Sequence, residues 1–161
     1  MTKTLPLYAM LLASTLSFSQ PALAVDEYNV SSGLTAAGAP LGVHGIDPVS
    51  LLKSGKRISG SAEYSAVHDG AAYYFSSQKN LDQFKSSPVS FLPQNGGFCT
   101  FGVSKGKKFD GDPNYATVID GKLYVFLNAQ IFKLFQKDKA GTISQAEANW
   151  PKIQHIAASE L

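Results

Sequence analysis

The chain has 161 residues, of which 44% are hydrophobic, and a formal net charge of only +2. A charge this close to zero excludes the long-range attraction to nucleic acid or anionic membranes on which strongly basic proteins rely. The length is enough for one domain with a hydrophobic core and too short for two.

The first 24 residues have the pattern of a cleaved secretory signal peptide. Lys3 supplies a cationic start, residues 5–18 an apolar run, and Ala22 and Ala24 the small residues that precede a cleavage site. Because the apolar run is shorter than the roughly 20 residues that cross a bilayer, we expect cleavage after Ala24 and no membrane span afterwards. The mature protein is then periplasmic or secreted.

Residues 25–43 mix glycine, serine and alanine without periodicity, which predicts an extended lead-in to a domain over 44–157. A short helix is expected over 48–54. Asp47 is a typical N-cap with a proline after it at the first helical position, and Gly55 is a typical stop.

The dipeptide Asp69-Gly70 predicts a β-hairpin of segments 64–68 and 71–75, because it accepts the positive φ angles of a two-residue turn. In that register Tyr64 lies opposite Phe75. Ser77 then caps a helix that runs through Lys85.

The same arrangement returns 51 positions later, with strands over 115–119 and 122–126 and a helix from Asn128 through Lys137. The matched pairs are Tyr64 with Tyr115, Val67 with Val118, Asp69 with Asp120, Gly70 with Gly121, Tyr73 with Tyr124, Phe75 with Phe126 and Phe84 with Phe135. Since a single hairpin cannot bury its apolar face alone, we predict an α+β fold of two pseudo-repeated hairpin-plus-helix units, about 45–92 and 96–138, packed in one domain.

A C-terminal helix is expected from about Thr142, because Ser144 and Glu147 have capping-box spacing. Trp150 is interpreted as a core residue. Pro151 should kink or end the helix.

The only cysteine, Cys99, lies in the glycine-bracketed segment 95–102, which we take as the candidate site. Glycine allows the backbone to approach a ligand closely. An unpaired cysteine in an exported protein is a buried small hydrophobe, a reactive thiol, a metal ligand or an intermolecular link.

Motifs over nearly the whole mature chain resemble the YHS domain family. They are Gly45-Ile46-Asp47-Pro48-Val49, Gly70 with Tyr73-Tyr74-Phe75-Ser76-Ser77, Phe84, Pro88-Val89-Ser90-Phe91, Gly96-Gly97-Phe98-Cys99, Asp120-Gly121-Lys122-Leu123-Tyr124 and Asn149-Trp150-Pro151. The resemblance implies a small α+β fold, related to modules attached to copper-transporting ATPases, and a role in binding metal, copper in particular.

The resemblance also implies cysteine ligands at three places, which here hold Ser50, Ser76 and Asn80. A hydroxyl group has little affinity for Cu(I) or Zn(II) beside a thiolate, so the ligand set of the metal-associated members is absent. The chain is more similar to an exported branch with a lone cysteine after a Gly-Gly-aromatic motif.

The first functional hypothesis is a metal-binding module. In it Cys99 is a thiolate ligand, and one or more of His44, His68 and His155 complete a copper or zinc site. A second hypothesis makes Cys99 a redox-sensitive thiol, its pKa lowered by lysines of the 105–108 cluster.

Cysteine-dependent hydrolysis with Asn149 and His155 has the wrong spacing, so we do not expect an enzyme. The remaining hypothesis is a non-metal ligand- or protein-interaction module with Cys99 packed inside. Its partner would be a small ligand or a periplasmic protein, and not a nucleic acid.

Overall fold

A computed structural model describes residues 26–161, so the expected signal peptide lies outside the described residues. The fold is α+β, as predicted. Its helices and strands are α1 (Pro48–Ser54), β1 (Ser61–His68), β2 (Ala71–Phe75), α2 (Gln78–Ser86), α3 (Thr100–Val103), β3 (Asp112–Ile119), β4 (Lys122–Phe126), α4 (Ala129–Phe135) and α5 (Lys139–Ile153). Short 3-10 turns are η1 (Val43–Gly45), η2 (Pro88–Ser90), η3 (Asn95–Gly97) and η4 (Ala158–Glu160).

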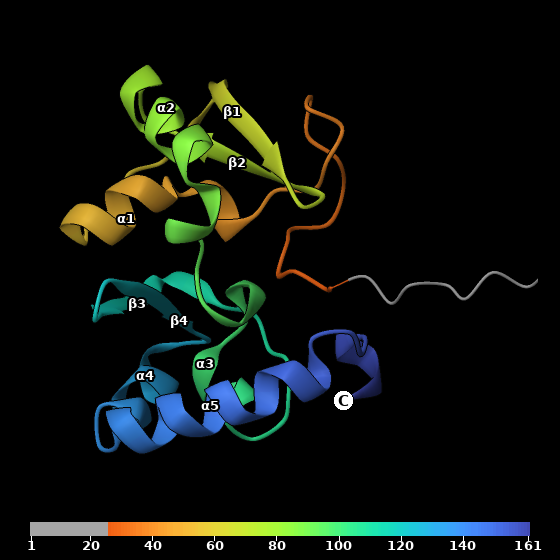
Figure 1. Ribbon diagram of the computed structural model, residues 1–161, viewed down its shortest axis with the longest axis vertical. Helices are drawn as coiled ribbons and strands as arrows, with labels where there is room; N and C mark the ends of the chain where they lie inside the picture. Colours follow the sequence, from red (N-terminus) through yellow and green to blue (C-terminus); the bar gives the residue numbers. More distant parts are fainter. Residues whose placement is uncertain (1–25) are drawn as a thin grey trace, which may run out of the picture.

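The molecule consists of two units stacked along its long axis (Figure 1). The first unit contains α1, β1, β2 and α2, and the second contains α3, β3, β4 and α4, with α5 along its far side. Strands β3 and β4 lie 51 positions after β1 and β2 at both ends. The hairpin-plus-helix repeat predicted from the sequence is therefore present in the fold.

Each unit contains an antiparallel hairpin whose turn has the predicted conformation. Asp69 and Gly70 have φ angles of 46° and 78°, and the equivalent turn has 51° at Asp120 and 73° at Gly121. The predicted pairing of Tyr64 with Phe75 is wrong, because Ser61 pairs with Phe75 and Ser65 with Tyr74.

The register shifts because four steps along β1 match a single step along β2, which is a bulge in β1. The second hairpin repeats the shift, with Asp112 opposite Phe126 and Ala116 opposite Val125. The bulge is therefore a shared feature of both units.

The short helices begin at the predicted caps. Asp47 accepts hydrogen bonds from the Val49 and Ser50 amides, Ser77 caps α2, and Asn128 caps α4. Helix α4 ends at Phe135, two residues before the predicted end.

The C-terminal helix begins earlier than predicted. Its cap is Asp138, which accepts a hydrogen bond of 2.9 Å from the Gly141 amide. Ser144 and Glu147 consequently lie inside the helix, and their spacing is not a capping box here. Pro151 is also inside α5, which ends two residues later at Ile153.

The buried apolar side chains form three clusters, and the first of them spans both units. The first gathers Val49, Leu51, Phe75 and Phe84 of the first unit and also Leu123 of β4. The second contains Cys99, Tyr124, Phe126 and Phe135, and the third Phe98, Val103, Ala146 and Ile153. Leu123 thus joins the second unit to the core of the first.

The segment 26–42, the predicted lead-in, has no long strand or helix but is hydrogen-bonded to distant parts of the chain. The Glu27 amide donates to the Gln154 carbonyl, and the Asn29 amide donates to the Gly96 carbonyl at 2.8 Å. This places residues 27–29 beside α5 and η3. None of the helices in residues 26–161 is long and apolar enough to cross a bilayer.

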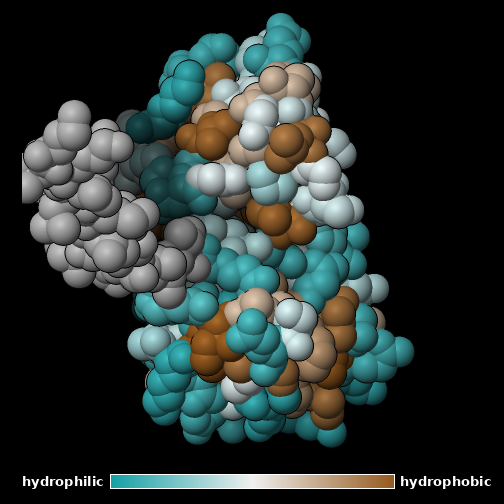
Figure 2. Space-filling view, turned by 90° about the vertical axis from the view of Figure 1, so that its right-hand side faces the viewer, coloured by the Kyte–Doolittle hydropathy of each residue, from teal (hydrophilic) through white to brown (hydrophobic). Residues whose placement is uncertain are grey.

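Exposed apolar side chains do not form one band. On the face drawn in Figure 2 they make separate patches on the two halves, with hydrophilic residues between them. Isolated apolar patches are normal on a protein surface, so this face gives no basis for a docking site.

Candidate functional site

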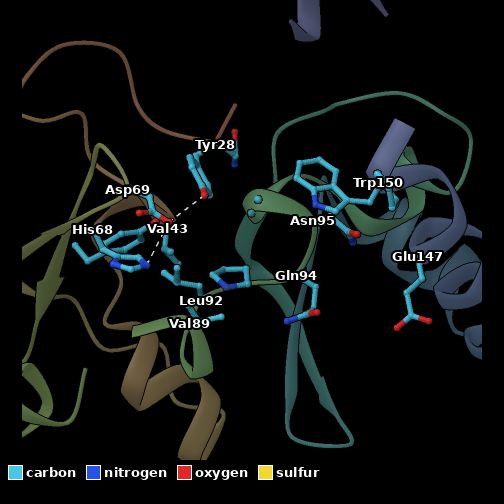
Figure 3. A pocket seen from close by; sticks show the side chains of 16 residues that line it. Tyr28, Val43, His68, Asp69, Val89, Leu92, Gln94, Asn95, Glu147 and Trp150 are labelled. Carbon is cyan, nitrogen blue, oxygen red and sulfur yellow. Dashed lines mark hydrogen bonds and ion pairs between the residues drawn. The ribbon is translucent and has the colours of Figure 1, made fainter. Parts of the chain in front are cut away.

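A cleft of about 320 Å³ lies where the two units, the segment 26–42 and α5 meet. Its volume is at the lower end of the range of small-molecule sites, about 300 to 1,000 Å³. The lining residues are Tyr28, Asn29, Val43, His68, Asp69, Tyr73, Val89, Leu92, Pro93, Gln94, Asn95, Gly96, Gly97, Glu147, Trp150 and Pro151. Figure 3 shows that Tyr28, His68 and Asp69 face Asn95, Trp150 and Glu147 across it.

A linked set of polar groups forms the first wall. The Tyr28 hydroxyl donates a hydrogen bond of 3.3 Å to Asp69 Oδ2, and His68 Nε2 lies 3.4 Å from the same oxygen. The His68 nitrogen is buried and has no hydrogen-bond partner among the described residues. Asp69 is placed here because it occupies the turn between β1 and β2.

The η3 turn forms the opposite wall. Asn95, Gly96 and Gly97 all have positive φ angles, of 56°, 60° and 79°. A Cβ at Gly96 would lie 2.9 Å from the Trp150 ring and 3.0 Å from the Glu27 carbonyl oxygen. Glycine is therefore required both for the backbone conformation and for the approach of Trp150.

Trp150 packs beside the third cluster and also lines the cleft. The Lys108 ammonium lies 5.5 Å from its ring centroid and 5.2 Å from that of Phe98. Its charge is balanced by the Glu27 carboxylate at 2.9 Å. Trp150 is thus partly buried against this cluster, at the edge of the core in which it was predicted, and is in addition part of a cavity wall.

Cys99 lies outside the cleft. It is 1% exposed, in the cluster with Tyr124, Phe126 and Phe135. Burial raises the pKa of its thiol above the ordinary value. The structure thus separates the two halves of the predicted site, since 95–97 line the cleft and Cys99 faces the core.

Each of the three histidines lies beside a different acidic residue. His44 Nε2 lies 2.9 Å from Asp110, and His155 Nδ1 lies 2.8 Å from Asp26, while His68 borders the cleft beside Asp69. The structure does not bring Cys99, His44 and His68 together as a ligand set. Within residues 26–161 no group of three or more His, Cys, Asp and Glu side chains is placed to hold a metal ion.

The three places at which the YHS resemblance implies cysteines do come together. Asn80 Nδ2 lies 2.9 Å from Ser50 Oγ and 3.3 Å from Ser76 Oγ. All three side chains also bond to Oδ2 of the fully buried Asp47, at 2.6 to 3.1 Å. These hydroxyl and amide groups are poor ligands for a soft metal and already satisfy one another, so the residues do not fit a copper centre.

Sequence reasoning missed most of the cleft. Tyr28, Asp69 and Trp150 were assigned to a lead-in, a turn and a core, because their meeting depends on how the two units stack. Two sequence predictions do fall on the cleft: the glycine pair at 96–97, and His68, which was predicted as a metal ligand and lines the cleft instead.

Comparison of the chain with models of protein families, with curated proteins and with solved structures found no match in any of the three.

Proposed function

We propose that this protein is an exported binding module of the YHS type that takes a small organic ligand into the cleft between its units. The observation that carries the proposal is the composition of the cleft. Apolar and aromatic side chains line it together with a few converging polar groups, which is the usual composition of a small-molecule site.

The origin of the lining residues also supports a binding role. They come from residues 28–29, η1, the first hairpin with its turn, the linker 89–97 and the second half of α5. The walls are thus fixed by packing and by hydrogen bonds between distant segments, such as that from Asn29 to Gly96. A preorganised site of this kind needs little ordering when a ligand enters.

The convergence of Ser50, Ser76 and Asn80 on Asp47 supports the YHS resemblance. Three positions that are far apart in the sequence, chosen only because relatives have cysteines there, meet in one cluster. The hydrogen bonds among them give these positions a structural role in place of metal binding. Export is supported by the signal-peptide pattern of residues 1–24.

The test is a binding screen followed by NMR spectroscopy of the ¹⁵N-labelled protein. A library of small organic compounds is added, and the backbone amide signals of residues 95–97 and the indole signal of Trp150 are followed. Because Trp150 is the only tryptophan in the chain, its indole signal is unambiguous. We expect at least one compound to shift these signals in a saturable way.

A pair of matched substitutions locates the site. Val89 lines the cleft and is 71% exposed, so Val89→Phe narrows the cleft without disturbing the core. Val67 is 49% exposed on β1 and is not a lining residue, so Val67→Phe is the control. The proposal requires that only Val89→Phe weakens binding. Shifts confined to residues elsewhere, or equal effects of both substitutions, contradict it.

A further inference from the structure

The charges that line the cleft have one sign. Asp69 and Glu147 carry the formal charges, and neither lysine nor arginine is among the lining residues in the described part of the chain. His68 is the one basic side chain in the lining.

Cations near the cleft are already paired. The Lys108 ammonium beside Trp150 is bound by the Glu27 carboxylate and by the carbonyls of Gln154 and Ile156, at 2.6 to 3.0 Å. Lys122 pairs with Glu147 at 3.3 Å on the exposed side. The Lys122 ammonium therefore partly offsets the negative charge of Glu147.

Asp69 is the carboxylate that keeps its charge available to the cleft. Its neighbours there are the neutral Tyr28 hydroxyl and the His68 imidazole at 3.4 Å, and no lysine or arginine pairs with it in residues 26–161. Burial, and then the charge of Asp69, raise the pKa of Tyr28. Burial also raises the pKa of Tyr73, with smaller contributions from Tyr28 and Asp69. Both phenols are consequently neutral at physiological pH.

Aromatic residues line the same cavity as this carboxylate. Tyr28, Tyr73 and Trp150 present rings to the same cavity. The face of such a ring attracts a cation within about 6 Å of its centroid. The Asp69 carboxylate, whose side chain is 59% exposed, borders a cavity with aromatic residues and with no lysine or arginine among its described lining residues. Such a cavity is complementary to a positively charged organic molecule and repels an anion.

We infer that the ligand of the cleft is a small organic cation, an amine or quaternary ammonium compound, whose charged group lies at Asp69 and whose apolar part lies against Tyr73, Leu92 and Trp150. The inference rests on the proposed function, because it names the chemical class of ligand for the same cleft.

The test compares probes of similar size and shape that carry different charges. One set is phenethylamine, phenethyl alcohol and hydrocinnamate, and a second is choline with its neutral isostere 3,3-dimethyl-1-butanol. Each probe is titrated into the ¹⁵N-labelled protein, and the amide signals of residues 69 and 95–97 and the Trp150 indole signal are followed. We expect the cationic member of each set to bind at least about 10-fold more tightly than its neutral partner.

Asp69→Asn removes the charge while keeping a residue type that tolerates the positive φ of the turn. Because the Asp69 side chain is 59% exposed and its charge is screened by solvent, we expect it to weaken cation binding about 2- to 5-fold and to leave the neutral probes unchanged. Asp120→Asn is the control, because it makes the same substitution at the equivalent turn of the second unit, outside the cleft.

Two results would overturn the inference in distinguishable ways. If neutral or anionic probes shift the cleft signals as strongly as cations, and Asp69→Asn has no effect, the ligand class is wrong while a binding cleft remains. If no probe of any charge shifts these signals, the inference fails together with the proposed function.

Discussion

The Lys108 ammonium lies 2.9 Å from the Glu27 carboxylate, although 81 positions separate the two residues in the sequence. The lysine side chain is fully buried and also donates to the carbonyls of Gln154 and Ile156. Glu27 Oε2 in turn accepts a hydrogen bond from the Ala158 amide at 2.8 Å. This pair ties the start of the described chain to its C-terminal end, directly behind the wall of the cleft.

Replacing Lys108 should therefore destabilise the protein. Lys108→Met keeps most of the side-chain volume but removes three hydrogen bonds and the partner of Glu27. We expect the free energy of unfolding in urea to fall by about 2 to 4 kcal/mol, less than for a fully buried pair because Glu27 is 37% exposed.

Lys105→Met is the matched control for this prediction. Its ammonium lies over the Phe101 ring, 5.4 Å from the centroid, and forms no ion pair in residues 26–161. We expect a change of less than about 0.5 to 1 kcal/mol. Equal losses from the two substitutions would mean that the ion pair contributes nothing beyond its packing.

The buried Asp47 carboxylate should make stability depend on acid pH. Burial alone would raise its pKa, but hydrogen bonds from Asn80, Ser76 and Ser50 outweigh this effect and lower the pKa below the ordinary value. The folded state thus binds this proton less readily than the unfolded state. The stabilisation is complete above the unfolded pKa, about 4, and is lost as the pH falls through the folded pKa.

We expect Asp47→Asn to lower the free energy of unfolding by about 2 to 4 kcal/mol at pH 7, since the amide cannot accept all of these hydrogen bonds. The loss should shrink below about pH 4. Asp82→Asn, at an exposed carboxylate of α2, is the control and should change stability by less than about 0.5 kcal/mol. Denaturant titrations from neutral to acid pH measure both effects, and parallel curves for wild type and Asp47→Asn would refute the assignment.

The Cys99 thiol should be inert in the folded protein. It is 1% exposed and its pKa is raised by burial, so little thiolate is present and reagents cannot reach it. We expect a disulfide reagent to label it only when denaturant unfolds the chain. In Val89→Cys, the added thiol at a 71% exposed position should react at once, which provides an internal control. Equally rapid labelling of Cys99 in the native protein would restore the thiol hypothesis.

Much of the fold could be predicted because its signals are local. The Asp69-Gly70 turn, the Asp47 cap and the 51-residue offset depend on residues close in sequence or on direct comparison of two segments. The bulge in β1 was missed because no short sequence pattern, comparable to the Asp69-Gly70 turn dipeptide, indicates that Ser61 pairs with Phe75. The start of α5 was misplaced because Ser144 and Glu147 have capping-box spacing, whereas the cap in the structure is Asp138, which accepts a hydrogen bond from the Gly141 amide.

The site was harder to predict for a different reason. Cys99 drew attention because it is the only cysteine, yet a lone thiol is chemically compatible with the core in which it lies. The cleft is formed by side chains as distant as Tyr28, Asp69 and Trp150, which meet only when the units stack. The sequence pattern of a single helix or strand does not indicate which residues of other elements will lie beside it.

The contact between Gly96 and Trp150 gives the last prediction, which links stability to the shape of the cleft. At Gly96 a Cβ would strain a backbone with a φ of 60° and would also meet the Trp150 ring at 2.9 Å. Gly106 has a similar φ of 74° but nothing within 4 Å of a Cβ. Gly106→Ala therefore measures the backbone cost alone, about 1 to 2 kcal/mol, whereas Gly96→Ala should cost about 2 to 4 kcal/mol.

Gly96→Ala should also move Trp150 away from η3, which changes its fluorescence spectrum and weakens binding of any compound that shifts the wild-type indole signal. Gly106→Ala should leave both the spectrum and the binding unchanged. Urea denaturation and fluorescence of the two variants, measured side by side, distinguish the backbone strain at a positive φ from the steric contact with the Trp150 ring. Equal stability losses with unchanged fluorescence would show that Trp150 does not pack against η3. The assignment of η3 and Trp150 to the opposite wall of the cleft would then be wrong.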